Sequence, residues 1–171
     1  MGLIGSQVID SKGYRKNVGM IVMNREGKLL WCRRYGQDAW QFPQGGIEPD
    51  ETPEQALYRE LSEETGLQRS QVALLGHTDD WLSYRIPKQY TRKRRDGLCV
   101  GQMQIWYLLK LETGGVEFDK ISTVQPEFDQ WRWVDYWYPV EHVIPFKRDV
   151  YLKALTELEP LWVQGRVVEA G

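Results

Sequence analysis

The sequence contains few of the residues that form disulfide bonds or hold zinc. Its 171 residues include two cysteines, Cys32 and Cys99, and two histidines, His77 and His142. The cysteines form no Cys-x-x-Cys pair, which argues against a disulfide scaffold and favours a reducing compartment. Two histidines are too few for a histidine-rich zinc site, and neither falls in a catalytic signature. We expect both histidines to be structural or surface residues.

Long apolar runs are also missing. Residues 1–16 lack the apolar core of about 7 to 15 residues that a signal peptide needs. No stretch approaches the roughly 18 apolar residues that span a bilayer. We therefore expect a cytoplasmic protein with no membrane partner.

Neither sign of charge is in large excess, but the two signs gather in different segments. The 22 lysines and arginines nearly balance the 24 aspartates and glutamates, and the net charge of -2 argues against wholesale attraction to nucleic acid. Acidic residues gather between Glu48 and Glu64, and basic ones at Arg15-Lys16, Arg33-Arg34, Lys147-Arg148 and above all Lys88–Arg95. Such a basic run is more often a solvated loop. Because it interrupts predicted strands, it is also a candidate wall of a phosphate-binding groove.

The order of apolar patterns predicts an α/β or α+β fold with a mixed sheet. Strands are expected at residues 18–23, 29–32, 72–76, 81–86, 102–111 and 131–134, and helices at about 53–65 and 146–158. The chain has no internal repeat and no dividing linker, so one domain is expected over residues 1–171. Of its eight tryptophans, Trp31, Trp106 and Trp133 lie in strand-like runs and are expected to pack in the core.

The helix expected at Pro53–Thr65 has clear start and stop signals. Thr52 is a suitable N-cap, Pro53 suits the first helical position, and Gln55 completes a capping box. Gly66 is the expected C-terminal stop. Before the helix, a strand-like Trp40–Pro43 leads into Gly45 and Gly46, which are expected to form a turn.

Three carboxylates share one face near the C-terminal end of this helix. At roughly 100° per residue, Glu60, Glu63 and Glu64 point to the same side. Like charges four residues apart repel, and the helix C-terminus is itself partially negative. Oxygen ligands without a nearby histidine or cysteine suit a hard cation, magnesium or manganese. Such a centre suits hydrolysis at phosphorus, in which a carboxylate takes a proton from the attacking water.

The spacing of these residues resembles the Nudix box of the Nudix hydrolase family in every specified position. Gly45 is followed after five residues by Glu51, and after seven more by the run Arg59–Leu67, which includes Gly66. An acidic helix taken alone is more often a solvated surface with an Arg59 to Glu63 salt bridge. The resemblance over the full string instead implies a Nudix fold, with a mixed sheet sandwiched between helices.

Five further segments resemble one branch of that family, the bacterial RNA pyrophosphohydrolases, also described as dinucleoside polyphosphate hydrolases. They are Gly13–Gly19, Trp40–Gly46, Pro126–Val134, Tyr136–Val140 and Phe146–Tyr151. The resemblance covers about residues 10–158 and leaves a short tail at 159–171. It implies removal of pyrophosphate from the 5′-triphosphate end of RNA, which would promote mRNA decay.

The resemblance also implies roles for individual residues. The metal carboxylates and catalytic residues fall on Glu60, Glu63, Glu64 and Glu127, with Gly45 beside the metal. Substrate-binding positions fall on Arg15 for phosphate, on Arg34 and Phe146 for a base, and on Lys147, Tyr84 and Gln102. From the residues alone, Glu127 is an ordinary loop acid, Arg34 a strand-end arginine and Phe146 a core aromatic.

Several readings of the function remain open at this stage. The implied cofactor is Mg²⁺, with Mn²⁺ as an alternative and more than one ion when substrate is bound. The implied partner is 5′-triphosphorylated RNA, and a protein activator is left open. The nearest rival has diadenosine polyphosphates as substrate. Two others are a catalytically idle RNA-binding module that keeps the fold, and an enzyme that sanitises small nucleotides.

Overall fold

The computed structural model describes residues 9–90, 93–94, 97–116 and 126–167. Part of the basic run lies outside this range, because Arg92 and Arg95 are not among the described residues. No helix among the described residues is long and apolar enough to cross a membrane.

A mixed sheet forms the middle layer of the fold. Its main strands are β1 (Tyr14–Met23), β2 (Leu29–Arg34), β5 (Val72–His77), β9 (Gly101–Leu111) and β10 (Phe128–Val134), in the order β10-β2-β1-β9-β5. The central pair β1 and β9 is parallel, and the other pairs are antiparallel. Three short strands extend the sheet: β3 (Trp40–Gln41) on β2, β4 (Gln44–Gly46) on β1, and β6 (Leu82–Arg85) on β9.

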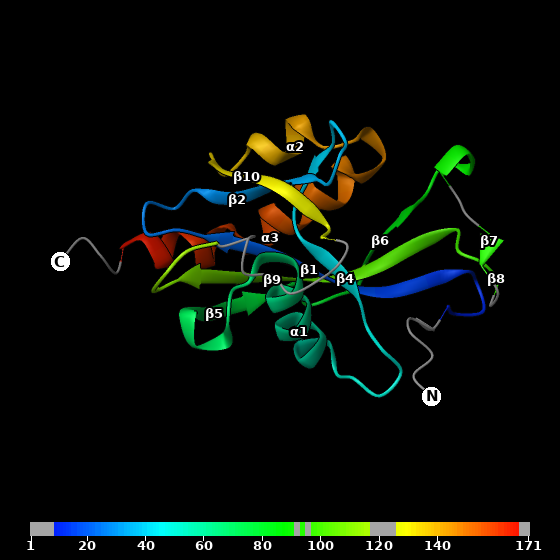
Figure 1. Cartoon of the computed structure of the whole chain (residues 1–171), viewed down its shortest axis with the longest axis horizontal. Helices are drawn as coiled ribbons and strands as arrows, with labels where there is room; N and C mark the ends of the chain where they lie inside the picture. The colour runs from blue at the N-terminus through cyan, green and yellow to red at the C-terminus, as the bar shows by residue number, and fades with distance from the viewer. Residues whose placement is uncertain (1–8, 91–92, 95–96, 117–125, 168–171) are drawn as a thin grey trace.

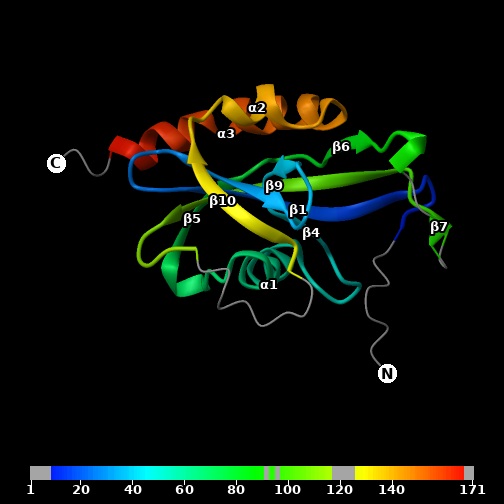
Figure 2. The same cartoon turned by 45° about the horizontal axis from the view of Figure 1, so that its top comes forward.

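Helices cover both faces of this sheet, as expected for the predicted fold. Helix α1 (Pro53–Thr65) lies under one face, and α2 (Tyr138–His142) and α3 (Arg148–Val167) lie over the other (Figures 1 and 2). Short 3₁₀ turns occupy Arg69–Gln71, Lys88–Tyr90 and Pro145–Lys147, and a small hairpin is formed by β7 (Lys93–Arg94) and β8 (Gly97–Leu98).

Strand alternation divides the core between the two faces. In β1, Ile21 and Met23 belong to the cluster under α3, whereas Met20 and Val22 belong to the cluster above α1. Successive side chains of a strand point to opposite faces, so one apolar strand supplies both cores. Two of the three tryptophans predicted to pack, Trp31 and Trp106, are fully buried, and Trp133 packs, half-buried, against the α1 cluster.

Helix α1 begins and ends where the sequence predicts. Thr52 accepts from the Gln55 backbone N–H, and the Gln55 side chain accepts from the Thr52 N–H, which completes the capping box. Gly66 ends the helix with φ of 77°, a left-handed conformation that glycine adopts at little cost. Leu57 and Leu61 are fully buried against the sheet.

Two strands begin earlier than the sequence patterns predict. β1 begins at Tyr14 rather than at residue 18, because Tyr14 pairs with Gly101 of β9. β10 begins at Phe128 rather than at residue 131, because Phe128 pairs with Arg34. The polar starts of β1 and β10 are strands because they pair with β9 and β2, and no local sequence pattern shows such pairing.

The expected end of the last helix is wrong. Helix α3 begins at Arg148, after a 3₁₀ turn, and runs past Leu158 and Pro160 to Val167, so most of the expected tail is helical. A proline inside a helix costs about 3 kcal/mol because it removes a hydrogen bond. Trp162 compensates: its ring stacks on Tyr136 at 4.1 Å between centroids, and its Nε1 donates to the Gly27 carbonyl at 2.7 Å.

Candidate active site

The three glutamates of α1 lie in different environments, although they share a helical face. The Glu60 side chain is 12% exposed and that of Glu63 is 58% exposed. Glu64 is buried. Among the described residues, no three histidine, cysteine, aspartate or glutamate side chains converge closely enough to form a metal-binding cluster.

Arg59 donates hydrogen bonds to several carboxylates at once and holds them in position. It donates to both carboxylate oxygens of Glu51, at 2.6 and 2.8 Å, to Glu60 at 2.8 Å and to Glu63 at 3.2 Å. A further bond, at 2.9 Å, goes to the Gly46 carbonyl. These bonds, led by the one to Glu51, raise the pKa of Arg59. The expected Arg59 to Glu63 pair is therefore present, but as one arm of a hub that ties the preceding loop to the helix.

Gly45 lies against Glu60, in a strand rather than in the expected turn. It pairs with Val18 as part of β4. A Cβ atom added to Gly45 would lie 2.1 Å from Cδ of Glu60. Glycine is needed at position 45 because the Glu60 carboxyl lies directly against the backbone. Its φ is not positive, so a left-handed conformation is not the reason.

Glu64 is a buried carboxyl whose pKa responds to the charges of two others. Burial raises its pKa well above the usual range, and the charges of Glu60 and Glu127 raise it further. Burial also raises the pKa of Glu60, although its contact with Arg59 opposes the shift. The contact between the two carboxyls raises the pKa of Glu64 and lowers that of Glu60, while the Gln44 backbone lowers the pKa of Glu64.

The donor set of this pair fits a hard divalent cation. Glu64 Oε2 is buried and has no hydrogen-bond partner among the described residues. Carboxylate oxygens are the ligands that magnesium and manganese prefer, and a cation can take the place of a proton on such a buried carboxyl. Glu60 and Glu64 could thus hold a metal, with Glu63 at the exposed side.

Glu127 comes close to this pair from a distant part of the chain. It directly precedes β10, and its charge acts on the pKa of Glu64. Its backbone carbonyl accepts from the Tyr35 N–H at 2.8 Å. Its side chain lies 3.8 Å from Nε of Arg34, both groups being 45% exposed. The pairing of β10 with β2 brings these residues together.

The expected substrate-binding residues gather on the α3 face of the sheet. Arg15, Gln102 and Tyr84 lie in one row across β1, β9 and β6, because Gln102 is paired with both of the others. The Phe146 ring lies 5.7 Å from that of Tyr84. Next to it, buried Lys147 donates to Gln41 Oε1 at 3.2 Å.

Lys147 links the residues around Tyr84 to Arg34 and Glu127. Burial lowers its pKa to about 8, the charge of Arg34 lowers it as well, and the charge of Glu127 raises it. Its Nζ lies 5.7 Å from the centre of the Tyr84 ring. Arg34, Phe146 and Lys147 are therefore neighbours around Tyr84, although they come from opposite ends of the chain.

Comparison with known proteins agrees with the arrangement of glycine, helix and carboxylates. Residues 13–155 match the NUDIX domain, which is most of the chain. The chain belongs to the NUDIX family. It is 56% identical over 153 residues to an RNA pyrophosphohydrolase of Marinomonas sp., covering 90% of this chain and 95% of that protein. It is 58% identical to an RNA pyrophosphohydrolase of Halorhodospira halophila, over 88% of this chain and 83% of that protein.

Solved structures show the same NUDIX fold at low sequence identity. The E. coli dihydroneopterin triphosphate pyrophosphohydrolase has a TM-score of 0.65 at 18% identity, over 83% of this chain and 95% of that one. A C. elegans Ap4A hydrolase has a TM-score of 0.55 at 18% identity, over 81% and 93%. The likeness to these structures concerns the fold alone.

The NUDIX site also contains residues to which the sequence patterns assign no role. Gln104 Nε2 donates to Asn17 Oδ1 at 2.8 Å and to Gln44 Oε1 at 3.3 Å, and Gln44 Nε2 donates to the Tyr84 hydroxyl at 3.4 Å. All four groups are buried or half-buried. The signal that could have revealed this network is the pair of amides at alternate positions of one strand, Gln102 and Gln104.

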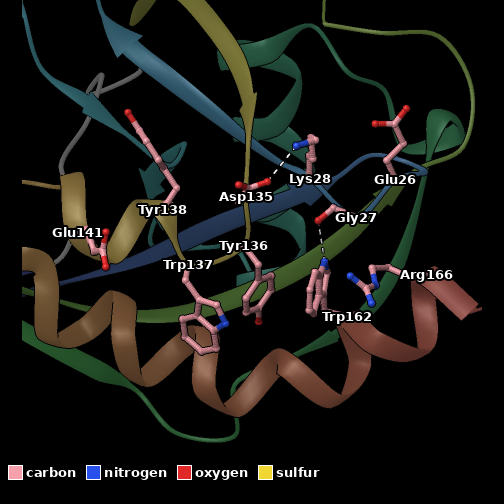
Figure 3. Close-up of a pocket in the computed structure, with 10 residues that line it drawn as sticks. All are labelled: Glu26, Gly27, Lys28, Asp135, Tyr136, Trp137, Tyr138, Glu141, Trp162 and Arg166. Atoms are coloured by element: carbon pink, nitrogen blue, oxygen red, sulfur yellow. Dashed lines mark hydrogen bonds and ion pairs between the residues drawn. The ribbon is translucent and has the colours of Figure 1, made fainter.

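A cavity of about 460 Å³ lies elsewhere on the NUDIX fold, beside α3 and the turn between β1 and β2 (Figure 3). Its wall includes the Lys28 to Asp135 ion pair, at 2.9 Å, and Arg166, whose guanidinium lies over the Trp162 ring. None of the predicted site residues lines it. The carboxylate chemistry is therefore separate from this cavity.

Proposed function

We propose that this NUDIX protein is a cytoplasmic RNA pyrophosphohydrolase, which releases pyrophosphate from the 5′-triphosphate end of RNA and leaves a 5′-monophosphate. The relatives of that name at 56% and 58% identity support this proposal. The observation that carries it within the structure is the position of Gln44. Its side chain donates to the Tyr84 hydroxyl at 3.4 Å, and the next residue, Gly45, lies directly against the Glu60 carboxyl, so the carboxylates and Tyr84 are adjacent.

The carboxylates would form the catalytic centre. Glu60, Glu63, Glu64 and Glu127, with the backbone at Gly45, would hold Mg²⁺ or Mn²⁺, and more than one ion when substrate is bound. Such ions neutralise phosphate oxygens and favour attack by water. One of these carboxylates, in its charged form, would take the proton of the attacking water.

The residues around Tyr84 would hold the RNA. Arg15 lies at the start of β1, in the same row as Tyr84, and would contact phosphate. Arg34, whose charge acts on Lys147, and Phe146, which directly precedes Lys147, would grip a base, since guanidinium planes and aromatic rings both stack on unpaired bases. Lys147 keeps its positive charge below a pH of about 8, which favours the phosphate chain. Tyr84 and Gln102 would form the floor of this RNA-binding part of the site.

The alternatives differ in substrate or in catalysis. Diadenosine polyphosphates share the phosphate chain and a stackable base, so both activities can coexist in this site. An idle RNA-binding module would not benefit from two neighbouring carboxyls whose pKa values are both raised by burial. A nucleotide-sanitising enzyme would gain little from the basic run at Lys88–Arg95.

A parallel substrate comparison tests the proposal. The pure protein with magnesium is given 5′-triphosphate RNA, diadenosine tetraphosphate and free nucleoside triphosphates, and kcat/KM is compared. We expect the highest value for RNA, with pyrophosphate as product, and loss of all three activities in Glu60→Gln. A higher value for either small substrate would replace the proposal with the corresponding alternative. Tight RNA binding without turnover would indicate the idle module.

A further inference from the structure

An aromatic row leads from the floor of the site to the solvent. Tyr84 is 7% exposed, Phe146 is half-buried, and Tyr90 is 52% exposed. The Phe146 ring centre lies 5.7 Å from that of Tyr84 and 5.8 Å from that of Tyr90, with interplanar angles of 43° and 33°. The three rings come from β6, from the 3₁₀ turn Lys88–Tyr90 and from the turn before α3. Sequence patterns assign no role to Tyr90.

Tyr90 is held in this position although its ring is exposed. Its backbone N–H donates to the Pro87 carbonyl at 2.9 Å. Before the turn, the Ile86 N–H donates to the Val100 carbonyl at 2.8 Å, which anchors the turn beside the start of β9. The ring packs on Phe146 and not in the main core, because neither core cluster includes it. An exposed ring that extends a row of aromatic side chains is suited to stacking a further base.

We propose that Tyr90 stacks the next base of the RNA, beyond the one gripped by Arg34 and Phe146. This inference rests on the proposed function. The triphosphate end must reach Glu60 and Glu64, so the remaining nucleotides leave the site on the solvent side. Tyr90 is the exposed end of the row, and successive aromatic side chains that stack successive bases are a common way to hold single-stranded RNA.

The ligand class follows from the ring itself. A phenol ring offers a π face to any base, so Tyr90 selects for an additional unpaired nucleotide and not for its identity. Mononucleotides are too short to reach it. Tyr90 would therefore discriminate between RNA ends and free nucleoside triphosphates, which share the phosphate chain and the first base.

The test compares ligand lengths in the inactive Glu60→Gln background. With Tyr90→Ala, the dissociation constant for a 5′-triphosphorylated trinucleotide should rise roughly tenfold, the size expected for losing one stacked base. The constant for ATP should not change. Tyr90→Phe should behave as the parent, and Trp137→Ala, which removes a surface ring 40% exposed outside the site, is the matched control.

Fluorescence distinguishes base stacking on Tyr90 from a purely structural role of this residue. A trinucleotide with 2-aminopurine at the second or third position should be quenched on binding, and Tyr90→Ala should remove the quenching at one of these positions. Equal weakening for ATP, or unchanged binding and quenching in folded Tyr90→Ala, would overturn the inference alone. If the parent protein neither binds nor cleaves triphosphorylated oligonucleotides, the proposed function itself fails.

Discussion

Gly45 and Glu60 are so close that a Cβ on the glycine would lie 2.1 Å from the carboxyl carbon. Gly45→Ala must therefore displace the Glu60 side chain or separate β4 from α1. We expect the variant to lose most of its activity and about 1 to 3 kcal/mol of unfolding free energy, the usual cost of overpacking. Activity assays and urea unfolding measure the two effects.

Gly115→Ala is the matched control, because an added Cβ there meets nothing within 4 Å. It should leave both activity and stability unchanged. Full activity in Gly45→Ala would show that the position of Glu60 is not needed for turnover.

Glu60→Gln should remove catalysis without unfolding the protein. The substitution keeps the shape and removes a charge that burial already disfavours. We expect kcat to fall by at least about 10²-fold, as for other positioned acid-base groups. Stability should hold or rise. Glu54→Gln, on the exposed first turn of the same helix, is the control: it should leave kcat unchanged and lower stability by at most about 1 kcal/mol, because it removes only a favourable charge at the helix N-terminus. Near-normal turnover at saturating magnesium would mean that Glu60 is neither ligand nor base.

Glu127→Gln tests whether the distant carboxylate belongs to the same centre. Its charge acts on the pKa of Glu64, so removing it should lower that pKa and weaken magnesium binding together. Isothermal titration with magnesium measures the affinity, and we expect a loss of about tenfold or more, the effect typical of groups that tune a metal site. Unchanged affinity would remove Glu127 from the centre.

Local chemistry explains which parts of this site the sequence could predict. The bounds of α1 follow from Thr52, Gln55 and Gly66, because caps act within a few residues. Glu127 and Arg34 meet only because β10 pairs with β2, and such pairing depends on the whole sheet. The continuation of α3 past Pro160 likewise depends on a distant contact, between Trp162 and the Gly27 carbonyl. Family resemblance, and not periodicity, named the residues that long-range pairing brings together.

Lys147 should make stability depend on pH in the alkaline range. Its pKa is about 8 in the folded protein, against 10.5 for the free group. Between these values the unfolded chain binds more protons, so stability rises with pH, and the cost of burying the charge is fully present below about pH 8. That cost is about 3 kcal/mol.

Lys147→Met removes the titrating group while keeping an unbranched apolar chain. We expect the variant to be more stable than the parent at pH 7 and the difference to shrink steadily up to pH 10. Urea unfolding across this range measures it. A difference that does not vary with pH would show that the Lys147 ammonium is not desolvated in the folded protein.

Arg33 and Arg34 are neighbours in β2 and should respond in opposite ways to the same substitution. Arg33 forms two bonds of 2.8 Å with Asp129, which lower the pKa of that carboxyl to about 2. Lysine cannot make this paired contact, so Arg33→Lys should lower the melting temperature and leave KM for RNA unchanged. Arg34 has only a looser contact, 3.8 Å from Glu127, in an exposed pair that adds little stability.

Arg34→Lys should instead leave folding intact and raise KM for RNA, because it keeps the charge and loses the flat surface that stacks on a base. Stacking of this kind contributes about 1 to 3 kcal/mol per base, so the rise should be about tenfold and close to that of Arg34→Ala. Phe146→Ala should act in the same way and Phe146→Trp should be tolerated. Thermal unfolding of each variant decides the interpretation: if the activity lost in Phe146→Ala tracks the loss of folded protein, Phe146 is a core residue and the base clamp fails.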